Sequence, residues 1–220
     1  MPATAIVSYD GTANDADALT LARVLGEAGA RLLLAYVLHS AQAPEADAAR
    51  ALLRRGAALL GDTDAETRLV AHPSTSDGLG RLAAREGAAL IVFGSAYRTP
   101  VGRVAPQTST QRLLDGGSTA LAIAPAGYDG REIRTIGLLA GLDDVAAIDT
   151  AHALATHYSA AVTDHGQGVD LLIVGSRPQA RTGTTLLCAR SESAIFDATA
   201  PVLVTARGVA LDFRTELYLA

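Results

Sequence analysis

Residues 87–95 read Gly-Ala-Ala-Leu-Ile-Val-Phe-Gly-Ser, a short apolar run that ends at a Gly-Ser turn. A similar run stands 81 positions later, at residues 168–176, and reads Gly-Val-Asp-Leu-Leu-Ile-Val-Gly-Ser. The same offset aligns residues 118–127 with residues 199–208. Any two buried strands that end in Gly-Ser look alike, but the equal spacing of both matches argues against coincidence. The pattern therefore predicts that one structural unit occurs twice in the chain.

Outside these matches, apolar runs alternate with segments of helical periodicity. The run at residues 32–38 is too continuous for a half-exposed strand and is typical of a strand covered on both faces. We expect strands at residues 5–9, 31–38, 67–71, 89–93 and 120–124, with helices at residues 15–28, 43–60, 76–86 and 108–114. Short apolar strands that alternate with helices indicate an α/β fold with a parallel sheet and right-handed crossovers.

The start of the chain also recurs, at an offset of 130 residues, because Gly11 aligns with Gly141. The two offsets, 130 and 81, differ by 49 residues, so the second unit lacks the stretch between its first helix and its fourth strand. Residues 160–163 imitate the missing second strand, yet few residues lead from there to Val169. Because a parallel crossover normally needs a dozen or more residues, we expect no parallel strand there. The second unit should be a small sheet of its first, fourth and fifth strands.

These matches divide the chain into a complete unit at residues 1–128, a shortened copy at residues 129–208 and a C-terminal tail at residues 209–220. The apolar residues of the tail are Leu211, Phe213, Leu217 and Leu219. We expect the tail to pack on sheet that the shortened copy leaves bare. The alternative is a disordered terminus.

The composition excludes several classes of protein. Apolar residues make up 49% of the 220 residues, which is enough for a core and excludes a disordered chain. All 18 basic residues are Arg and form no stripe, so we expect no nucleic-acid partner. A single cysteine, Cys188, excludes an internal disulfide and fits a reducing compartment. With no signal-like start and no apolar run near the length of a membrane span, we expect a cytoplasmic protein without a membrane partner.

Three stretches resemble the universal stress protein family. Residues 5–12, Ala-Ile-Val-Ser-Tyr-Asp-Gly-Thr, look like its opening strand and Asp-Gly-Ser turn. Residues 34–37 look like its second strand, and residues 90–95 with 120–123 look like its last two strands. The resemblance implies an adenine-nucleotide alpha-hydrolase-like sheet of strand order 3-2-1-4-5, flanked by helices and followed by the reduced second copy. The chain would then be a tandem universal stress protein.

The resemblance also implies how the two copies meet. In that family the fifth strand lies at an edge of the sheet, and copies dimerise through it. Open edges invite pairing. We therefore expect residues 120–124 and 201–205 to form an antiparallel pair that makes an internal pseudo-dimer, and a homodimer is a further hypothesis.

Members of the family that bind ATP carry Gly, two residues, Gly, nine residues and Gly-Ser or Gly-Thr after the fourth strand. Glycines let phosphate oxygens approach backbone N–H groups closely. The first copy keeps Gly94 but has Tyr97 and Gln107 at the other two positions. The second copy keeps Gly175 but has Pro178 and Cys188. The phosphate loop is therefore altered in both copies.

By the same resemblance, Asp10 would lie beside the nucleotide and the backbone of Val37 would hold the adenine. The second copy has Ala140 at the Asp position and lacks the strand that carries Val37. The candidate nucleotide-binding residues are therefore Asp10, Gly11, Thr12, Val37, Gly94, Ser95, Gln107 and Thr108. The alternative is structural: Asp10 forms a turn, and Thr108 caps a helix.

We find no catalytic or metal-binding pattern. The five histidines show no metal-ligand spacing, and Cys188 has no histidine close in sequence. We therefore expect no enzyme, but a non-catalytic regulatory or interaction module of the stress response in which ATP binding is weak or lost. The second hypothesis is a sensor that binds ATP or AMP as its cofactor in the first copy only, and the third is an enzyme of the same superfamily.

Overall fold

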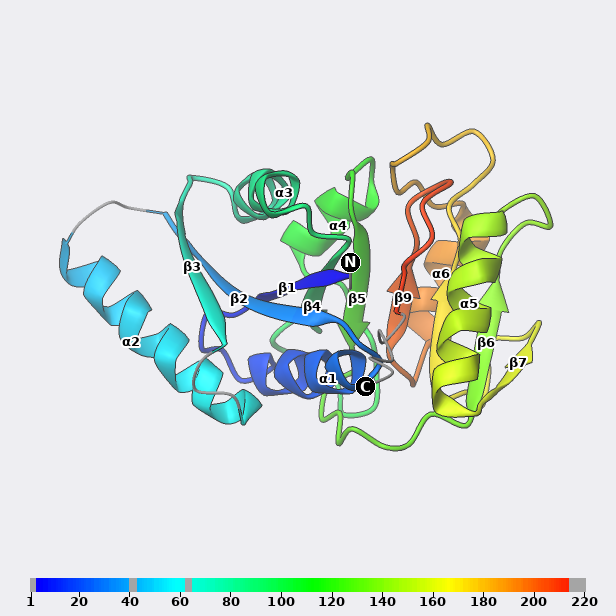
Figure 1. Ribbon diagram of the computed structural model, residues 1–220, viewed down its shortest axis with the longest axis horizontal. Coiled ribbons are helices and arrows are strands. Elements are labelled where there is room, and N and C mark those ends of the chain that lie inside the picture. Colours follow the sequence, from blue (N-terminus) through cyan, green and yellow to red (C-terminus); the bar gives the residue numbers. More distant parts are fainter. Residues whose placement is uncertain (1–2, 40–42, 62–64, 214–220) are drawn as a thin grey trace, which may run out of the picture.

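The computed structural model describes residues 3–39, 43–61 and 65–213. In this part of the chain a sheet of nine strands runs through the molecule in the order β3-β2-β1-β4-β5-β9-β8-β6-β7. Neighbouring strands are parallel except for β5 and β9, which are antiparallel (Figure 1). The elements are β1 (Thr4–Ser8), α1 (Asp15–Glu27), β2 (Arg31–Leu38), α2 (Ala43–Leu60), β3 (Glu66–Ala71), α3 (Thr75–Glu86), β4 (Leu90–Gly94), α4 (Thr108–Leu114), β5 (Ala120–Ala124), β6 (Thr135–Leu139), α5 (Val145–Tyr158), β7 (Ala161–Thr163), β8 (Leu171–Val174), α6 (Ala189–Asp197) and β9 (Val202–Val204).

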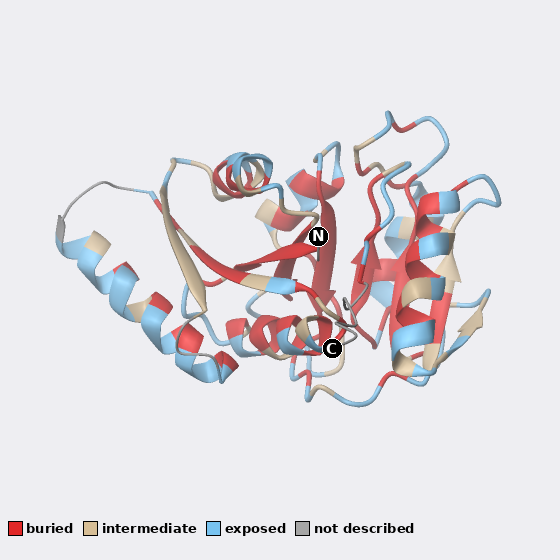
Figure 2. Ribbon diagram, viewed as in Figure 1, coloured by how far each residue is buried: buried red, intermediate tan, exposed pale blue. Residues whose placement is uncertain are grey.

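The first five strands have the order 3-2-1-4-5, as the resemblance implied. Every residue of β4 and β5 is buried, because helices cover both faces of the sheet (Figure 2). One apolar core joins the sheet to α1, α2 and α5, and a second joins the opposite face to α3, α4 and α6. Continuous apolar runs are thus the signature of these central strands.

The second half repeats part of this arrangement, because β6, β8 and β9 are parallel neighbours like β1, β4 and β5. The expectation of three strands is wrong, however. Residues 161–163 form β7, which pairs parallel with β6 in the place that β2 takes beside β1. The described part of this half therefore has four strands and has no counterpart of β3 or α3.

Few residues are enough to connect β7 to β8, because the end of β7 and the start of β8 lie at nearly the same height in the sheet. Thr163 lies opposite Gly137 of β6, and Leu171 lies opposite Ile136. The chain has only to cross two strand spacings, about 10 Å, and residues 164–170 can span about 23 Å. Gly137 makes room for this path: an added Cβ there would lie 2.4 Å from the carbonyl oxygen of His165. A short β7 and a glycine beneath the crossover replace the usual long connection.

The two halves meet at β5 and β9, where Leu121 pairs with Val204 and Ile123 with Val202. This is the antiparallel pair expected for residues 120–124 and 201–205. The described part of the tail lies near the same junction, since the Leu211 N–H donates to Thr150 Oγ1 of α5 and the Ala3 N–H donates to the Asp212 carbonyl. Leu211 and Phe213 are buried there, so these two residues pack at the junction of the halves. Leu217 and Leu219 lie outside the described residues.

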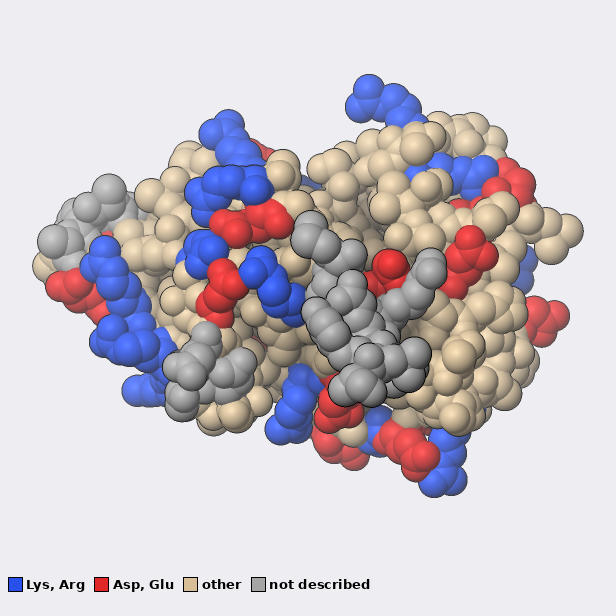
Figure 3. Space-filling model, viewed as in Figure 1, with Lys and Arg blue, Asp and Glu red and all other residues tan. Residues whose placement is uncertain are grey.

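Among the described residues, no helix is both long and apolar enough to cross a membrane. On the face in Figure 3, arginine and acidic side chains are interspersed.

Candidate functional site

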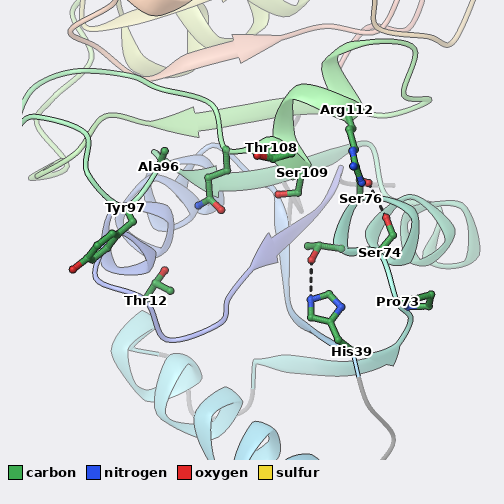
Figure 4. Close-up of a pocket in the computed structure, with 12 residues that line it drawn as sticks. Thr12, His39, Pro73, Ser74, Ser76, Ala96, Tyr97, Thr108, Ser109 and Arg112 are labelled. Carbon is green, nitrogen blue, oxygen red and sulfur yellow. Dashed lines mark hydrogen bonds between the residues drawn. The ribbon is translucent and has the colours of Figure 1, made fainter.

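A polar cavity of the first half lies where the strand order reverses, between β1 and β4. It has a volume of about 480 Å³, within the usual range for ligand pockets. Loops after β1, β2, β3 and β4 and the N-terminal parts of α3 and α4 line it (Figure 4). Its described lining consists of Thr12, His39, Pro73, Ser74, Thr75, Ser76, Ala96, Tyr97, Gln107, Thr108, Ser109 and Arg112. Parallel α/β sheets bind ligands at this kind of crevice.

Three candidate residues line this cavity: Thr12, Gln107 and Thr108. The other five, Asp10, Gly11, Val37, Gly94 and Ser95, lie near it but are not part of its described lining. The contacts of these five residues give each of them a structural role.

The loop after β1 is organised by Asp15, which the sequence analysis did not single out. The N–H groups of Asp10 and Gly11 both donate to Asp15 Oδ2 at 2.6 Å. Burial, with the nearby negative charge of Asp10, raises the pKa of Asp15 to about 7. The Asp10 carboxylate accepts from the Thr12 N–H at 3.0 Å, so Asp10 forms the turn of the structural alternative. Gly11 has φ +79°, a conformation that favours glycine.

Gly94 and Val37 are held by packing. An added Cβ at Gly94 would lie 2.1 Å from the carbonyl oxygen of Asn14, so the glycine admits the start of α1 against the end of β4. The Asn14 side chain then donates to the carbonyls of Ser95 and Ala96, each at 2.7 Å. The Val37 side chain is buried beside Gly78 of α3.

Ser95 serves the connection between β4 and β5. Its hydroxyl donates to the Ala124 carbonyl at 2.7 Å and accepts from the Ala105 N–H at 3.2 Å. Ser176 repeats these contacts in the second half, with the Thr205 carbonyl and the Leu186 N–H. The repeated Gly-Ser pair thus marks a shared loop anchor.

The loop between β4 and α4 carries the two residues that replace glycine. Tyr97 is 72% exposed at the rim of the cavity. Gln107 is the N-cap residue of α4, and its Nε2 donates to the Gly94 carbonyl at 3.4 Å. Thr108 is the first helical residue, so the interpretation of Thr108 as the cap is wrong by one position. Gln107 is the N-cap residue instead, because its backbone is extended and α4 begins at the next residue.

Among the cavity residues that were missed from the sequence are His39, Ser74, Ser76 and Arg112. His39 Nδ1 donates to the His72 carbonyl at 3.1 Å, and Nε2 lies 3.3 Å from Thr75 Oγ1. The oxygens of Ser74 and Ser76 lie 3.0 Å apart, and Ser74 caps α3 by accepting from the Asp77 N–H. His39 and Ser74 follow predicted strands, and this position is the signal that could have identified them.

The second half has a cavity of about 540 Å³ at the ends of β6 and β8. Gly175, Pro178 and Cys188 all line it, together with Arg177 and Arg190. Cys188 is the N-cap residue of α6, and hydrogen bonds from Ser191 lower the pKa of its thiol. Among the described residues, no group of three or more His, Cys, Asp or Glu side chains could hold a metal ion.

No family model and no curated protein matches the sequence. Solved structures do match the fold. A universal stress protein from Archaeoglobus fulgidus is 12% identical, with a TM-score of 0.68 and coverage of 93% of this chain and 98% of that one. A putative universal stress protein from Pseudomonas aeruginosa is 13% identical, with a TM-score of 0.64 and coverage of 92% of each chain. The fold is therefore of the nucleotide alpha-hydrolase-like α/β class, with a mostly parallel sheet flanked by helices. More particularly, it is the fold of the universal stress proteins.

Proposed function

We propose that this protein is a non-catalytic regulatory or interaction module of the stress response, placed in the cytoplasm, in which ATP binding is weak or lost. The loop between β4 and α4 carries this proposal. A triphosphate site needs free backbone N–H groups at such a loop. Here six N–H groups of the loop already have protein acceptors, namely those of Ala96, Thr99, Gly102, Arg103, Val104 and Ala105.

The side chains of the loop support the same conclusion. Tyr97 and Gln107 stand where the family resemblance places glycines, and each adds bulk beside the cavity. Losing two backbone hydrogen bonds to a charged phosphate weakens a micromolar site about a hundredfold or more. ATP should therefore bind with a dissociation constant above roughly 0.1 mM.

The cavity chemistry supports a non-catalytic role. His39 uses both ring nitrogens in contacts with His72 and Thr75. No Asp or Glu belongs to the described lining, so His39 has no carboxylate partner there for general acid–base work. Hydroxyls dominate the lining, and hydroxyls without an activating base are poor nucleophiles.

Calorimetric titration of the full chain with ATP tests this proposal, together with an assay for release of ADP or AMP. We expect weak or absent binding and no turnover. A dissociation constant on the order of 1 μM that Asp10→Ala abolishes and Asp129→Ala leaves unchanged would contradict weak binding. Asp129 is an exposed aspartate of the segment between β5 and β6 and is the matched control. Turnover of ATP would contradict the non-catalytic role.

A second candidate is a sensor of AMP-like ligands that uses the first half only. One observation favours it: Arg112 lines the cavity and has no ion-pair partner among the described residues. A single arginine suits one phosphate better than three. AMP that binds at least tenfold more tightly than ATP would favour this candidate.

We further propose that the two halves form an internal pseudo-dimer. The antiparallel pairing of β5 with β9 supports it. Because this pairing uses the edges that full copies would offer each other, a homodimer of the chain would use a different surface. Sedimentation of the full chain shows whether such a homodimer forms.

A further inference from the structure

The cavity between β1 and β4 has a donor-rich end and an acceptor-rich end. We propose that Arg112, Ser109, Ser74 and Ser76 bind the phosphate of a phosphorylated polyol, away from the loop between β4 and α4. The proposal rests on the second candidate above, a small-ligand sensor in the first half, and names the ligand class and the residues that select it.

The donor end is built from two helices that pack together. Ser109 and Arg112 are three residues apart on α4 and therefore share a helix face. The two helices face each other at Gly80 of α3, where an added Cβ would lie 4.0 Å from Leu113 Cδ2 of α4. Figure 4 shows the Arg112 side chain pointing from α4 towards Ser76 and Ser74 at the start of α3. One cation thus faces a group of hydroxyls.

The charge of Arg112 has no counterion in this place. Eight of the 17 described arginines form ion pairs, among them Arg68 with Glu86 and Arg103 with Asp197, and Arg112, which is exposed, is one of the nine that form none. Arg112 has no such partner in the described part of the chain, and the described lining of its cavity holds no carboxylate. A guanidinium beside hydroxyls and no acid is suited to an anion with several acceptor oxygens.

The serine pair keeps one hydrogen for a ligand. Ser74 Oγ already accepts from the Asp77 N–H. The two hydroxyls share a single hydrogen bond of 3.0 Å, in which either can donate. Whichever donates, the hydrogen of the other hydroxyl remains free, and Ser76 is only 3% exposed. A phosphate oxygen at this position would accept that hydrogen.

The opposite end of the cavity offers acceptors. Gln107 Nε2 donates to the Gly94 carbonyl, which leaves the Gln107 Oε1 as an acceptor. The Thr12 hydroxyl donates to Asp15 Oδ1 at 3.3 Å, so its oxygen is also left to accept. Hydroxyl groups of a sugar or other polyol would supply the missing donors. An anion at one end and hydroxyls at the other describe a sugar phosphate or the ribose phosphate of a nucleoside monophosphate.

Calorimetry on the full chain with ribose 5-phosphate, ribose and ATP tests this inference. We expect ribose 5-phosphate to bind the unmodified chain and ribose alone to bind at least tenfold more weakly. Loss of one charge-assisted contact in Arg112→Gln should weaken ribose 5-phosphate about tenfold to a hundredfold. The control is Arg81→Gln on the exposed side of α3, which should leave the affinity unchanged. Ser76→Ala should weaken binding less than Arg112→Gln does.

The outcomes separate this inference from the proposals on which it rests. Ribose 5-phosphate that binds Arg112→Gln as tightly as the unmodified chain overturns the phosphate subsite and leaves the sensor standing. Failure of ribose 5-phosphate to bind the unmodified chain overturns the subsite as well. Tight ATP binding that is indifferent to Arg112→Gln overturns both the subsite and weak ATP binding. Thermal unfolding of each variant confirms that lost binding is not lost folding.

Discussion

In each half a polar residue lies against the glycine of the repeated Gly-Ser pair. That residue is an asparagine in the first half and an aspartate in the second. In the first half, Asn14 lies against Gly94 and donates two hydrogen bonds of 2.7 Å to backbone carbonyls. In the second half, the residue 130 positions later is Asp144, which lies against Gly175. An amide can donate to carbonyls without bringing charge, whereas a carboxylate only accepts and must be paired when it is buried.

The second half therefore depends on an ion pair that the first half does not need. Asp144 is 1% exposed, and burial raises the pKa of its carboxyl group. Arg207 Nη1 lies 3.7 Å from Asp144 Oδ1, and Arg207 Nη2 lies 2.6 Å from Asp143 Oδ2. The comparison teaches that a shortened repeat can keep its backbone geometry while it exchanges neutral hydrogen bonds for charge pairing.

The largest expected effect follows from breaking that ion pair. Arg207→Leu leaves the buried Asp144 carboxylate unpaired and should lower the free energy of unfolding by about 3 kcal/mol at pH 8. Chemical denaturation measures it. Asp144→Asn, which copies Asn14 of the first half, should recover most of this loss when it is combined with Arg207→Leu. A double variant that is no more stable than Arg207→Leu alone would show that the charge of Asp144 is not the cause.

A smaller effect, a difference of about 2 kcal/mol, distinguishes the two glycines. Gly94→Ala should cost about 3 kcal/mol, because its Cβ would meet the backbone oxygen of Asn14, which cannot move without shifting α1. Gly175→Ala should cost about 1 kcal/mol, because its Cβ would meet the side-chain Oδ2 of Asp144 at 2.5 Å and that group can turn aside. Denaturation of both variants gives the difference. Equal losses would contradict the distinction between a backbone and a side-chain obstacle.

Much of the fold could be predicted because its strands are buried on both faces. Residues 90–94 and 120–124 read as continuous apolar runs, and the family resemblance supplied the order of the strands. β7 was missed for a physical reason: the prediction assumed that the chain must travel back along the sheet, whereas β7 and β8 end and begin at nearly the same level. The height at which a strand begins or ends depends on the register of the sheet, and residue spacing along the sequence does not give that register.

Less of the candidate site could be predicted. Thr12, Gln107 and Thr108 were identified because a family pattern marks them, and all three line the cavity. Arg112 and Ser76 carry no pattern, since a lone arginine or serine on a helix is usually a solvated residue. What selects them is the packing of α3 against α4, which brings residues 36 positions apart to one cavity.

The pH dependence of stability should also test the role of Asp15 in the first half. Asp15 has a raised pKa of about 7 against an ordinary value of 3.8, while the aligned residue of the second half is Val145. The folded state then binds more protons than the unfolded state between these values, so the free energy of unfolding falls as pH rises from 4 to 7. The loss reaches about 1.4 kcal/mol per pH unit. Asp15→Asn should reduce this slope. An unchanged slope would mean that the N–H groups of Asp10 and Gly11 keep the carboxylate ionised.

The smallest expected effect is a difference near zero between Ser95→Ala and Ser176→Ala. Each serine donates to a carbonyl of the last strand of its half and accepts from a loop N–H. Each substitution should therefore cost about 1 kcal/mol, and the two costs should agree within about 0.5 kcal/mol. Denaturation gives the stabilities, and titration with ribose 5-phosphate gives the affinity of each variant. Because Ser95 bonds to Ala124 and Ala105 and is not part of the described lining, Ser95→Ala should leave the affinity unchanged. A loss of affinity in Ser95→Ala, with Ser176→Ala unaffected, would show that Ser95 contributes to ligand binding and that the two serines are not equivalent.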